Sequence, residues 1–451
     1  MSYTDLTFWL FLAAVVAGVA LLPPPARRVW LILASLVFYA APDAMRLVWL
    51  AAICGVTLVA SAPPQKGPAR IRKGCGFAVL VLVLLWARFF ELAGLPDPQA
   101  PPGLSFLVFT AIALIAGGTR TAGWGQRVGL ILHLLWFPKL LAGPIERAGA
   151  LIPQFPDIAV RPKLASLGLA YLVTGLVKKV VIADTLSPVV AAGFAQPALA
   201  APVDLLLSVY AFAFQIYCDF SGYSDIAIGL SALVGLRLSR NFDRPYLSVT
   251  VSEFWSRRWH VTLGTWFRDF VYIPLGGSRA GRARQAMNLM TVFLLSGLWH
   301  SGLGYGLGWG FVVWGAMNGA FVVAETFLPV PSRALPKLLR AIVTFHLLLL
   351  TWVFFRADGI GAALTLLRRL AQNMGAFPAL IPAHPYTADH RLCATLVGAL
   401  FLAEAAAGRP GIAGRLAAMP LPLRWAGLYA GLGLLLLAGR WQGQEFIYAG
   451  F

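Results

Sequence analysis

The chain has 451 residues, of which 59% are hydrophobic and only 12% are charged. A soluble globular protein carries about 25% charged residues, so this chain has too few charges to cover a water-facing surface. The composition excludes a soluble enzyme, a disordered protein and a nucleic-acid-binding domain, and it predicts an all-α polytopic membrane protein surrounded by membrane lipid. The net charge of +18 is then attributed to cytoplasmic loops, where the positive-inside rule collects Lys and Arg.

The first apolar segment covers residues 6–22. No Lys or Arg precedes it, and no small-residue cleavage site follows it cleanly. About 20 apolar residues are needed to cross the hydrocarbon core, so we interpret this segment as a first membrane span rather than a cleavable signal peptide.

Uncharged stretches then recur between short charged segments. Several are shorter than a full crossing, which predicts tilted, broken or re-entrant helices and roughly 10–12 spans in all. The longest stretch, 287–324, has room for two spans with a turn near the glycines at 302, 304, 306 and 308. The stretches are 29–41, 47–60, 76–87, 102–119, 164–177, 205–218, 287–324, 341–355, 392–403 and 425–439.

Charge sidedness predicts the orientation of the first spans. Basic segments at 27–28, 66–73 and 120–127 alternate with poorer turns near 43–46 and 91–97. If the basic segments are cytoplasmic, the N-terminus lies outside.

A basic and aromatic segment follows at 237–284, with nine arginines against three acidic residues. One interpretation is an interfacial layer that contacts anionic headgroups. The other is a cytoplasmic mouth for an anionic, phosphorylated donor, because Arg binds phosphate in a bidentate manner. Both hold together if the donor enters from a basic cytosolic face. Arg257 and Arg258 of this segment are candidate donor-binding residues.

Two histidines stand in apolar surroundings, His260 in a Trp-rich segment and His300 within the longest apolar stretch. Ionisable residues inside a membrane are costly and mark functional sites. A neutral imidazole in a dry site can accept a proton from a hydroxyl. No third ligand accompanies the pair, and four cysteines lack CxxC spacing, so neither a metal site nor a tightly bound cofactor is predicted. His133 and His346, alone in apolar segments, are interpreted as structural.

Several long segments carry a family resemblance. They are FPKLLAGPIERAGALIPQF (137–155), GLVKKVVIAD (175–184), FQIYCDFSGYSDIAIGLSALVGLRLSRNFDRPY (214–246), FWSRRWHVTLGTWFRDFVYIPLGG (254–277), SGLWHS (296–301), WVFFRA (352–357) and FIYAGF (446–451). Together they resemble the membrane-bound O-acyltransferase (MBOAT) family, in its bacterial branch of alginate O-acetyltransferase-like proteins.

The resemblance implies a ring of tilted helices around a central tunnel. It divides one integral membrane unit into N-terminal helices at 1–100, a catalytic core at 101–330 and C-terminal helices at 331–451. The essential histidine of the family falls on His300, and its upstream polar partner falls on His260. Two positions depart from the usual pattern: Ser301 stands where Gly is usual, and Asn318 where relatives often have His.

The resemblance also implies a reaction. A cytosolic acyl thioester, acetyl-CoA, presents its acyl group to a hydroxyl that His300 deprotonates. His260, Asn288 or the indole N–H of Trp299 is expected to stabilise the oxyanion. Tyr223 and Asp225, with Asp219, either line the tunnel or form a polar network at a helix interruption. The expected product is an O-acetylated extracellular or periplasmic polysaccharide, made at the bacterial inner membrane with an extracytoplasmic SGNH or alginate-acetylation-type partner transferase.

Two other functions are compatible with the sequence. A D-alanyl transferase acting on teichoic acid belongs to the same family and takes its donor from an acidic carrier protein, which the basic segment would also suit. A non-catalytic transporter or scaffold would also place polar residues near the membrane midplane. A transporter needs no thioester-dependent turnover, so the role of His300 separates these alternatives.

Overall fold

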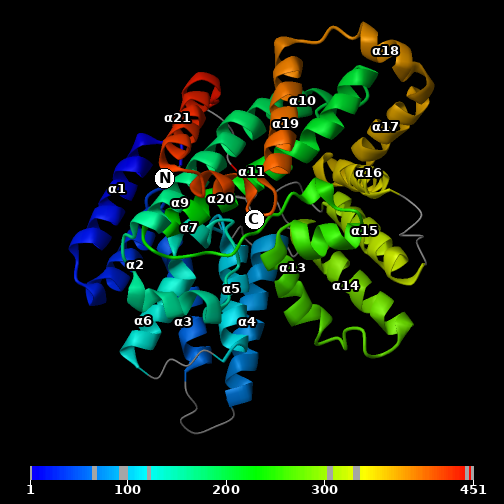
Figure 1. The fold of residues 1–451 in the computed structure, drawn as a ribbon. Helices are drawn as coiled ribbons and strands as arrows, with labels where there is room; N and C mark the ends of the chain where they lie inside the picture. The colour runs from blue at the N-terminus through cyan, green and yellow to red at the C-terminus, as the bar shows by residue number, and fades with distance from the viewer. Residues whose placement is uncertain are drawn as a thin grey trace.

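The computed structural model describes residues 3–62, 69–90, 100–118, 123–301, 308–328, 336–441 and 446–447. Throughout these residues the chain forms helices and no strands, which confirms the predicted all-α fold (Figure 1). The first part contains α1 (Leu6–Leu21), α2 (Pro24–Ala40), α3 (Arg46–Ser61), α4 (Ala69–Phe89), α5 (Leu104–Ala116), α6 (Trp124–Leu135), α7 (Phe137–Leu140), α8 (Ala148–Leu151) and η1 (Ile152–Asp157).

The central part is built on two long helical segments. The first is continuous over 33 residues, and the second, α11, has 32 residues and would be about 48 Å long at 1.5 Å per residue. This exceeds the roughly 30 Å of the hydrocarbon core, so α11 must tilt or extend beyond it. The segments are α9 (Pro162–Leu176), η2 (Val177–Ala183), α10 (Asp184–Phe194) and α11 (Pro202–Leu233).

The chain after α11 alternates short helical pieces with loops before long helices resume. Two of the short pieces, η4 and η5, are π-helical turns, a form that is frequent at functional sites. These elements are η3 (Pro245–Leu247), α12 (Val251–Glu253), η4 (Phe254–Arg258), α13 (Val261–Phe267), η5 (Arg268–Tyr272), α14 (Arg282–Ser301), α15 (Trp309–Phe327), α16 (Lys337–Arg356), α17 (Gly359–Gln372), η6 (Met374–Ala376), α18 (Phe377–Ala383), α19 (Ala388–Ala407), α20 (Gly411–Ala417) and α21 (Leu421–Ala438).

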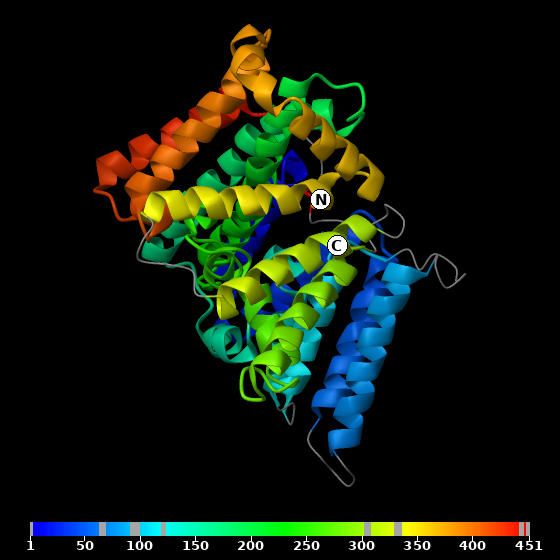
Figure 2. The same cartoon turned by 90° about the vertical axis from the view of Figure 1, so that its right-hand side faces the viewer.

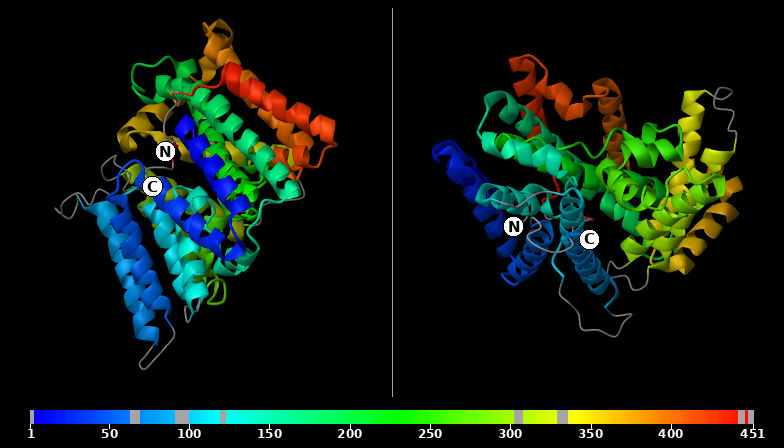
Figure 3. Two further views of the ribbon diagram at one scale, coloured as in Figure 1. Left: turned by 90° about the vertical axis from the view of Figure 1, so that its left-hand side faces the viewer. Right: turned by 90° about the horizontal axis from the view of Figure 1, so that it is seen from below.

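The helices are arranged around α11. Helices α9, α10, α16 and α17 pack against it, and α16 lies across the central helices in Figure 2. The α3–α4 hairpin stands at one edge of the molecule (Figure 3). The two described ends meet near the centre, where the rings of Tyr3 and Phe446 are 5.9 Å apart.

Six helical segments of the described chain are long and apolar enough to cross a membrane, which confirms a multi-pass membrane protein. Four shorter apolar helices accompany them, as expected for re-entrant or broken spans. The total of 10–12 spans and the division at 100 and 330 stay predictions. The turn near the glycines at 302–306, the basic residues Lys66 and Arg120, and most of the 446–451 motif lie outside the described residues.

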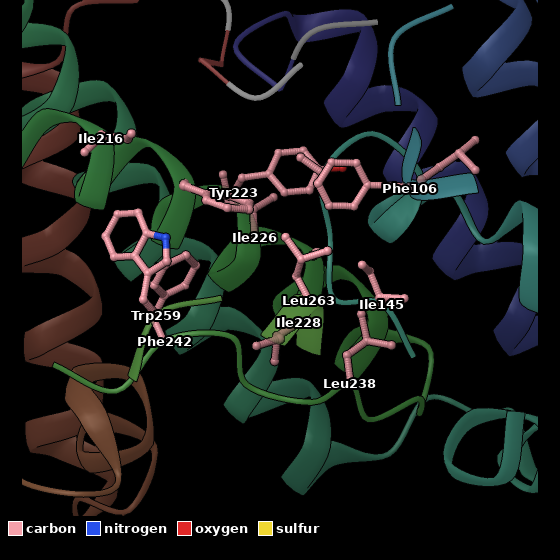
Figure 4. Packing of buried hydrophobic residues seen from close by; sticks show 14 of the residues in the cluster. Phe106, Ile145, Ile216, Tyr223, Ile226, Ile228, Leu238, Phe242, Trp259 and Leu263 are labelled. Carbon is pink, nitrogen blue, oxygen red and sulfur yellow. The ribbon is translucent and has the colours of Figure 1, made fainter. Parts of the chain in front are cut away.

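The core is assembled from segments far apart in sequence. Figure 4 shows Trp259 next to Phe242, and their ring centroids are 5.1 Å apart with perpendicular planes. Edge-to-face pairs of this kind are favoured over sandwiched rings. Leu263, Leu238 and Ile145 from three separate segments converge in the same view.

Glycine pairs bring α9 and α11 into close backbone contact. A Cβ on Gly175 would lie 2.7 Å from the carbonyl oxygen of Gly222, and one on Gly168 would lie 2.8 Å from that of Gly229. Both pairs are spaced by seven residues, so they repeat on one face of each helix. Small residues allow such close packing inside a membrane, where van der Waals contact replaces the hydrophobic effect as the force between helices.

We expect Gly175→Ala to destabilise the fold by about 1–3 kcal/mol, the usual cost of inserting a methyl group into a packed interface. The added Cβ would meet backbone atoms, which cannot rotate away. Thermal unfolding of the detergent-solubilised protein measures this effect. Gly55→Ala in α3 is the control, because a Cβ there has no neighbour within 4 Å among the described atoms. Equal melting temperatures for the two variants would contradict the packing argument.

Candidate active site

A cavity of about 400 Å³ lies between α13, α14 and α15, and both His260 and His300 line it. The sequence prediction that these two histidines share one site is therefore consistent with the geometry. Aromatic and aliphatic side chains supply most of the exposed wall, and polar side chains are interspersed among them, which is the usual character of a small-molecule site. The lining includes Trp255, Trp259, Phe267, Phe293, Trp314, Leu263, Leu289, Val292, Val322, Ser252, Ser256, Thr265, Arg268, Tyr272, Gln285, Ser296 and Thr326.

His300 sits in the last turn of α14 and is 3% exposed. Its Nδ1 lies 2.6 Å from the backbone carbonyl oxygen of Ser296, one helical turn earlier. A carbonyl can only accept a hydrogen bond, so Nδ1 carries the proton and the neutral ring presents the lone pair of Nε2. Trp314 and Phe355 surround the ring, with centroids 5.1 and 5.4 Å away. The backbone of α14 thus selects the tautomer.

Glycines allow α15 to approach α14 beside this histidine. A Cβ on Gly297 would lie 2.5 Å from the carbonyl oxygen of Phe311, and one on Gly315 would lie 2.4 Å from that of Phe293. This close contact brings Trp314 from α15 against the His300 ring. The glycine in SGLWHS is therefore a packing requirement.

His260 has a left-handed backbone, with φ 42° and ψ 52°, where it begins α13. This conformation costs a non-glycine residue roughly 1–2 kcal/mol. Asn241 holds the chain that follows, since its carbonyl accepts the N–H of Val261 and its side chain accepts the N–H of Thr262. Strain of this kind persists only where the surrounding structure imposes it. Here the imposed backbone conformation fixes the direction of the His260 side chain.

The His260 ring is buried among aromatic side chains. Its centroid lies 4.7 Å from that of Phe220 on α11, edge to face, and 5.9 Å from that of Phe106 on α5. Neither ring nitrogen has a hydrogen-bond partner among the described residues. A buried polar atom without a partner is costly, so these nitrogens are suited to a bound substrate or water.

The basic segment contributes Arg268 to the cavity lining. Its side chain is 61% exposed and pairs with Asp269, which also binds Arg147. Arg257 is exposed, and Arg258 pairs with Glu253 at 2.7 Å; neither is part of the lining. The positive charge that reaches the cavity thus comes from a residue that the sequence did not single out.

Asn288 and Trp299 lie beside the cavity rather than in its lining. The amide of Asn288 donates to the carbonyl oxygens of Gly277 and Leu275, at 2.9 and 3.3 Å, and so holds the loop before α14. The Trp299 ring packs against His300, with centroids 4.4 Å apart.

Tyr223 and the nearby carboxylates lie in a different network. The sequence suggested a helix interruption near Asp219 and Asp225; this was wrong, because α11 is continuous over this segment. Lys178 pairs with Asp225 at 2.7 Å, and Lys179 pairs with Asp219 at 2.8 Å. Tyr223 donates to the carbonyl oxygen of Pro138. The alternative of a structural polar network fits these contacts.

Sequence reasoning missed the groups that support the cavity wall. Asn318 is buried and accepts a hydrogen bond of 2.9 Å from the indole N–H of Trp255, a lining residue. The carbonyl of Ser296 could not be recognised, since a backbone atom leaves no trace in residue type. One feature of the sequence could have identified Asn318: it is a polar residue in an apolar helix, where its side chain needs a hydrogen-bond partner.

Comparison with known proteins supports the interpretation of the motifs. The family model for MBOAT, the membrane-bound O-acyltransferase family, matches residues 130–354. A probable alginate O-acetylase (AlgI) of Pseudomonas putida is 35% identical over 75% of this chain and 73% of its own length. Another, of Azotobacter vinelandii, is 38% identical over 58% of this chain and 52% of its own length. A peptidoglycan O-acetyltransferase of Helicobacter pylori is 36% identical over 52% of this chain and 45% of its own length.

We expect Lys179→Ala to destabilise the protein by about 3–5 kcal/mol, the usual result of removing one partner from a buried ion pair. Lys179 is 4% exposed and binds both Asp184 and Asp219 at 2.8 Å, so its loss leaves two buried carboxylates without this cation. Thermal unfolding in detergent is the measurement, and Lys163→Ala at an exposed position of α9 is the control. A melting temperature like that of the control would argue against a structural role for the network.

Proposed function

The chain belongs to the membrane-bound O-acyltransferase family, and on this premise we propose that it is an O-acetyltransferase that moves an acetyl group from cytosolic acetyl-CoA to a hydroxyl acceptor. The final acceptor is an extracytoplasmic polysaccharide, as the names of the alginate and peptidoglycan relatives suggest. The protein works in the bacterial inner membrane and passes the acetyl group across or within it. An extracytoplasmic SGNH or alginate-acetylation-type transferase completes the transfer.

The proposed chemistry depends on one observation: the Nδ1 of His300 is hydrogen-bonded to the backbone carbonyl oxygen of Ser296. With the proton on Nδ1, Nε2 carries the lone pair of a ring that lines the cavity. This arrangement supports His300 as a general base, because a neutral imidazole held in one tautomer can accept a hydroxyl proton.

The reaction follows from this assignment. The acceptor oxygen attacks the thioester carbonyl carbon while its proton passes to Nε2 of His300. The C–O bond forms, the C–S bond then breaks, and the departing thiolate takes the proton from the imidazolium. A ring N–H of His260 donates to the developing oxyanion, a role supported by the lack of a hydrogen-bond partner for either nitrogen among the described residues. The largely apolar wall excludes water, so the acyl group goes to the acceptor rather than to hydrolysis.

The phosphates of the donor meet the basic segment. Arg268 is both exposed and part of the cavity lining, so it can hold an anionic group outside while the thioester reaches inside. Asp269 stays paired with Arg147 when Arg268 turns to a ligand. Arg257, exposed nearby, adds positive charge that attracts the donor.

Substitution of His300 tests the general base. We expect His300→Gln to lower acetylation by about 10²–10⁴-fold, because glutamine keeps hydrogen bonding but accepts no proton at neutral pH. The measurement is acetate released by mild base from the extracellular polymer of cells that depend on this chain. D-Alanine released in place of acetate would support the teichoic acid alternative.

His133→Gln is the matched control, since His133 is buried and lies outside the cavity lining. Protein abundance and gel-filtration profile must match the wild type in both strains. Wild-type acetate from a stable His300→Gln protein would refute the general base and favour a transporter or scaffold.

Substitution of Arg268 tests the donor mouth. We expect Arg268→Ala to weaken CoA binding by roughly 5-fold at low salt, since an exposed charge pair contributes about 1 kcal/mol. The difference should shrink at high salt as the charges are screened. Isothermal titration of the purified protein with CoA gives the affinity. Arg279→Ala is the control, being exposed in the same basic segment but outside the cavity lining. Equal losses for both variants would indicate a diffuse field rather than a contact.

A further inference from the structure

Three potential metal ligands converge at one end of α11, away from the cavity. Asp204 is in the first turn of α11, His384 directly follows α18, and His390 is in the first turn of α19. One ligand atom from each lies within 4.8 Å of the other two. Phe220, the α11 residue that touches His260, is 16 residues after Asp204, or about 24 Å along the helix. The cluster is therefore separate from the proposed active site.

We propose that Asp204, His384 and His390 bind a divalent transition-metal ion, Zn²⁺. Zinc accepts imidazole nitrogen and carboxylate oxygen at about 2.0–2.2 Å, and a tetrahedral site then separates its ligand atoms by roughly 3.3–3.6 Å. The Nε2 of His384 is 3.2 Å from Oδ1 of Asp204, and the Nε2 of His390 is 3.9 Å from the same oxygen. The three atoms lie within 4.8 Å of one another, so binding one ion requires the side chains to draw together.

The surroundings of His384 favour a ligand. Its side chain is 8% exposed, and its Nε2 has no hydrogen-bond partner among the described residues, although Asp204 is near. The contact thus has the distance but not the direction of a hydrogen bond. A metal ion beside both atoms would satisfy the nitrogen lone pair and the carboxylate together.

Thr387 orients the second imidazole. The Nδ1 of His390 lies 3.2 Å from both the backbone N–H and the hydroxyl oxygen of Thr387. The backbone N–H can only donate, so Nδ1 accepts it in this structure and the ring proton sits on Nε2, which faces Asp204. Zinc binding through Nε2 requires this proton to move to Nδ1, where the Thr387 hydroxyl accepts it. Metal-binding histidines are typically held by such a bond from the other ring nitrogen.

A simple ion pair is the competing explanation. Asp in the first turn stabilises a helix start by itself, and one protonated histidine would complete the pair. A simple ion pair does not require a second imidazole near the same carboxylate oxygen. A metal ion with three protein ligands does require both imidazoles there. The ion would join α11 to the α18–α19 linker, about 180 residues away, and would leave a fourth position for water.

Zinc binding to the full-length protein in detergent tests the proposal. The protein is purified with a tag that lacks histidine, stripped with EDTA, equilibrated with Zn²⁺ and desalted before metal analysis. We expect one zinc per chain and a higher thermal unfolding midpoint with zinc than with EDTA. Co²⁺ in place of zinc should give the intense visible absorption of a tetrahedral site.

The variants His384→Ala and Asp204→Asn should lose more than about 100-fold in zinc affinity, because even the loss of outer-shell partners costs 10–100-fold. His346→Ala is the control, an exposed histidine outside the cluster. Asp204→Asn preserves size, so it remains informative if His384→Ala fails to fold. A wild-type protein that takes up no zinc, or variants that bind it as tightly as the control, would overturn the proposal.

Discussion

The close contact of α9 and α11 is the constraint on which the rest of the molecule depends. Glycine faces glycine at Gly175–Gly222 and at Gly168–Gly229, so the two backbones touch without intervening side chains. In lipid the hydrophobic effect does not hold helices together, because acyl tails are as apolar as the side chains. The close backbone contact stabilises the helix pair through dispersion instead. It also brings Lys178 and Lys179, which follow α9, to Asp225 and Asp219 of α11. These buried ion pairs exist only while the two helices remain together.

The cavity of the proposed active site takes its geometry from this core. Phe220 of α11 packs edge to face on His260, so the position of α11 determines where that ring lies. On the other side, α14 and α15 meet through Gly297 and Gly315 and enclose His300 between Trp299 and Trp314. The cavity is therefore held between two glycine-mediated helix pairs. Such rigid support is what a positioned base requires, because small displacements cost large factors in rate.

The two histidines differ in backbone conformation and in the hydrogen bonding of their rings. The Nδ1 of His300 is hydrogen-bonded to its own helix, which leaves the lone pair of the neutral ring on Nε2. His260 occupies a strained backbone and has neither nitrogen hydrogen-bonded to a described residue. A group that moves a proton needs a defined tautomer, whereas a group that stabilises charge in the transition state needs an unused donor. In the proposed reaction the pair divides these tasks, in a surrounding of low polarity that would strengthen both interactions.

Composition and motif order by themselves determined the membrane class, the helical fold and the family, and they singled out the two histidines as candidates. These properties depend on the fraction of hydrophobic residues, on the length of the apolar segments and on the order of residues within the motifs. The sequence could not reveal that α11 runs unbroken through Asp219 and Asp225, because tertiary ion pairs with Lys179 and Lys178 compensate the charges that suggested an interruption. Nor could it reveal the Ser296 carbonyl, the contribution of Arg268, or the meeting of Asp204 with His384 and His390. Backbone atoms carry no residue signature, and groups about 180 positions apart become neighbours only when the helices pack.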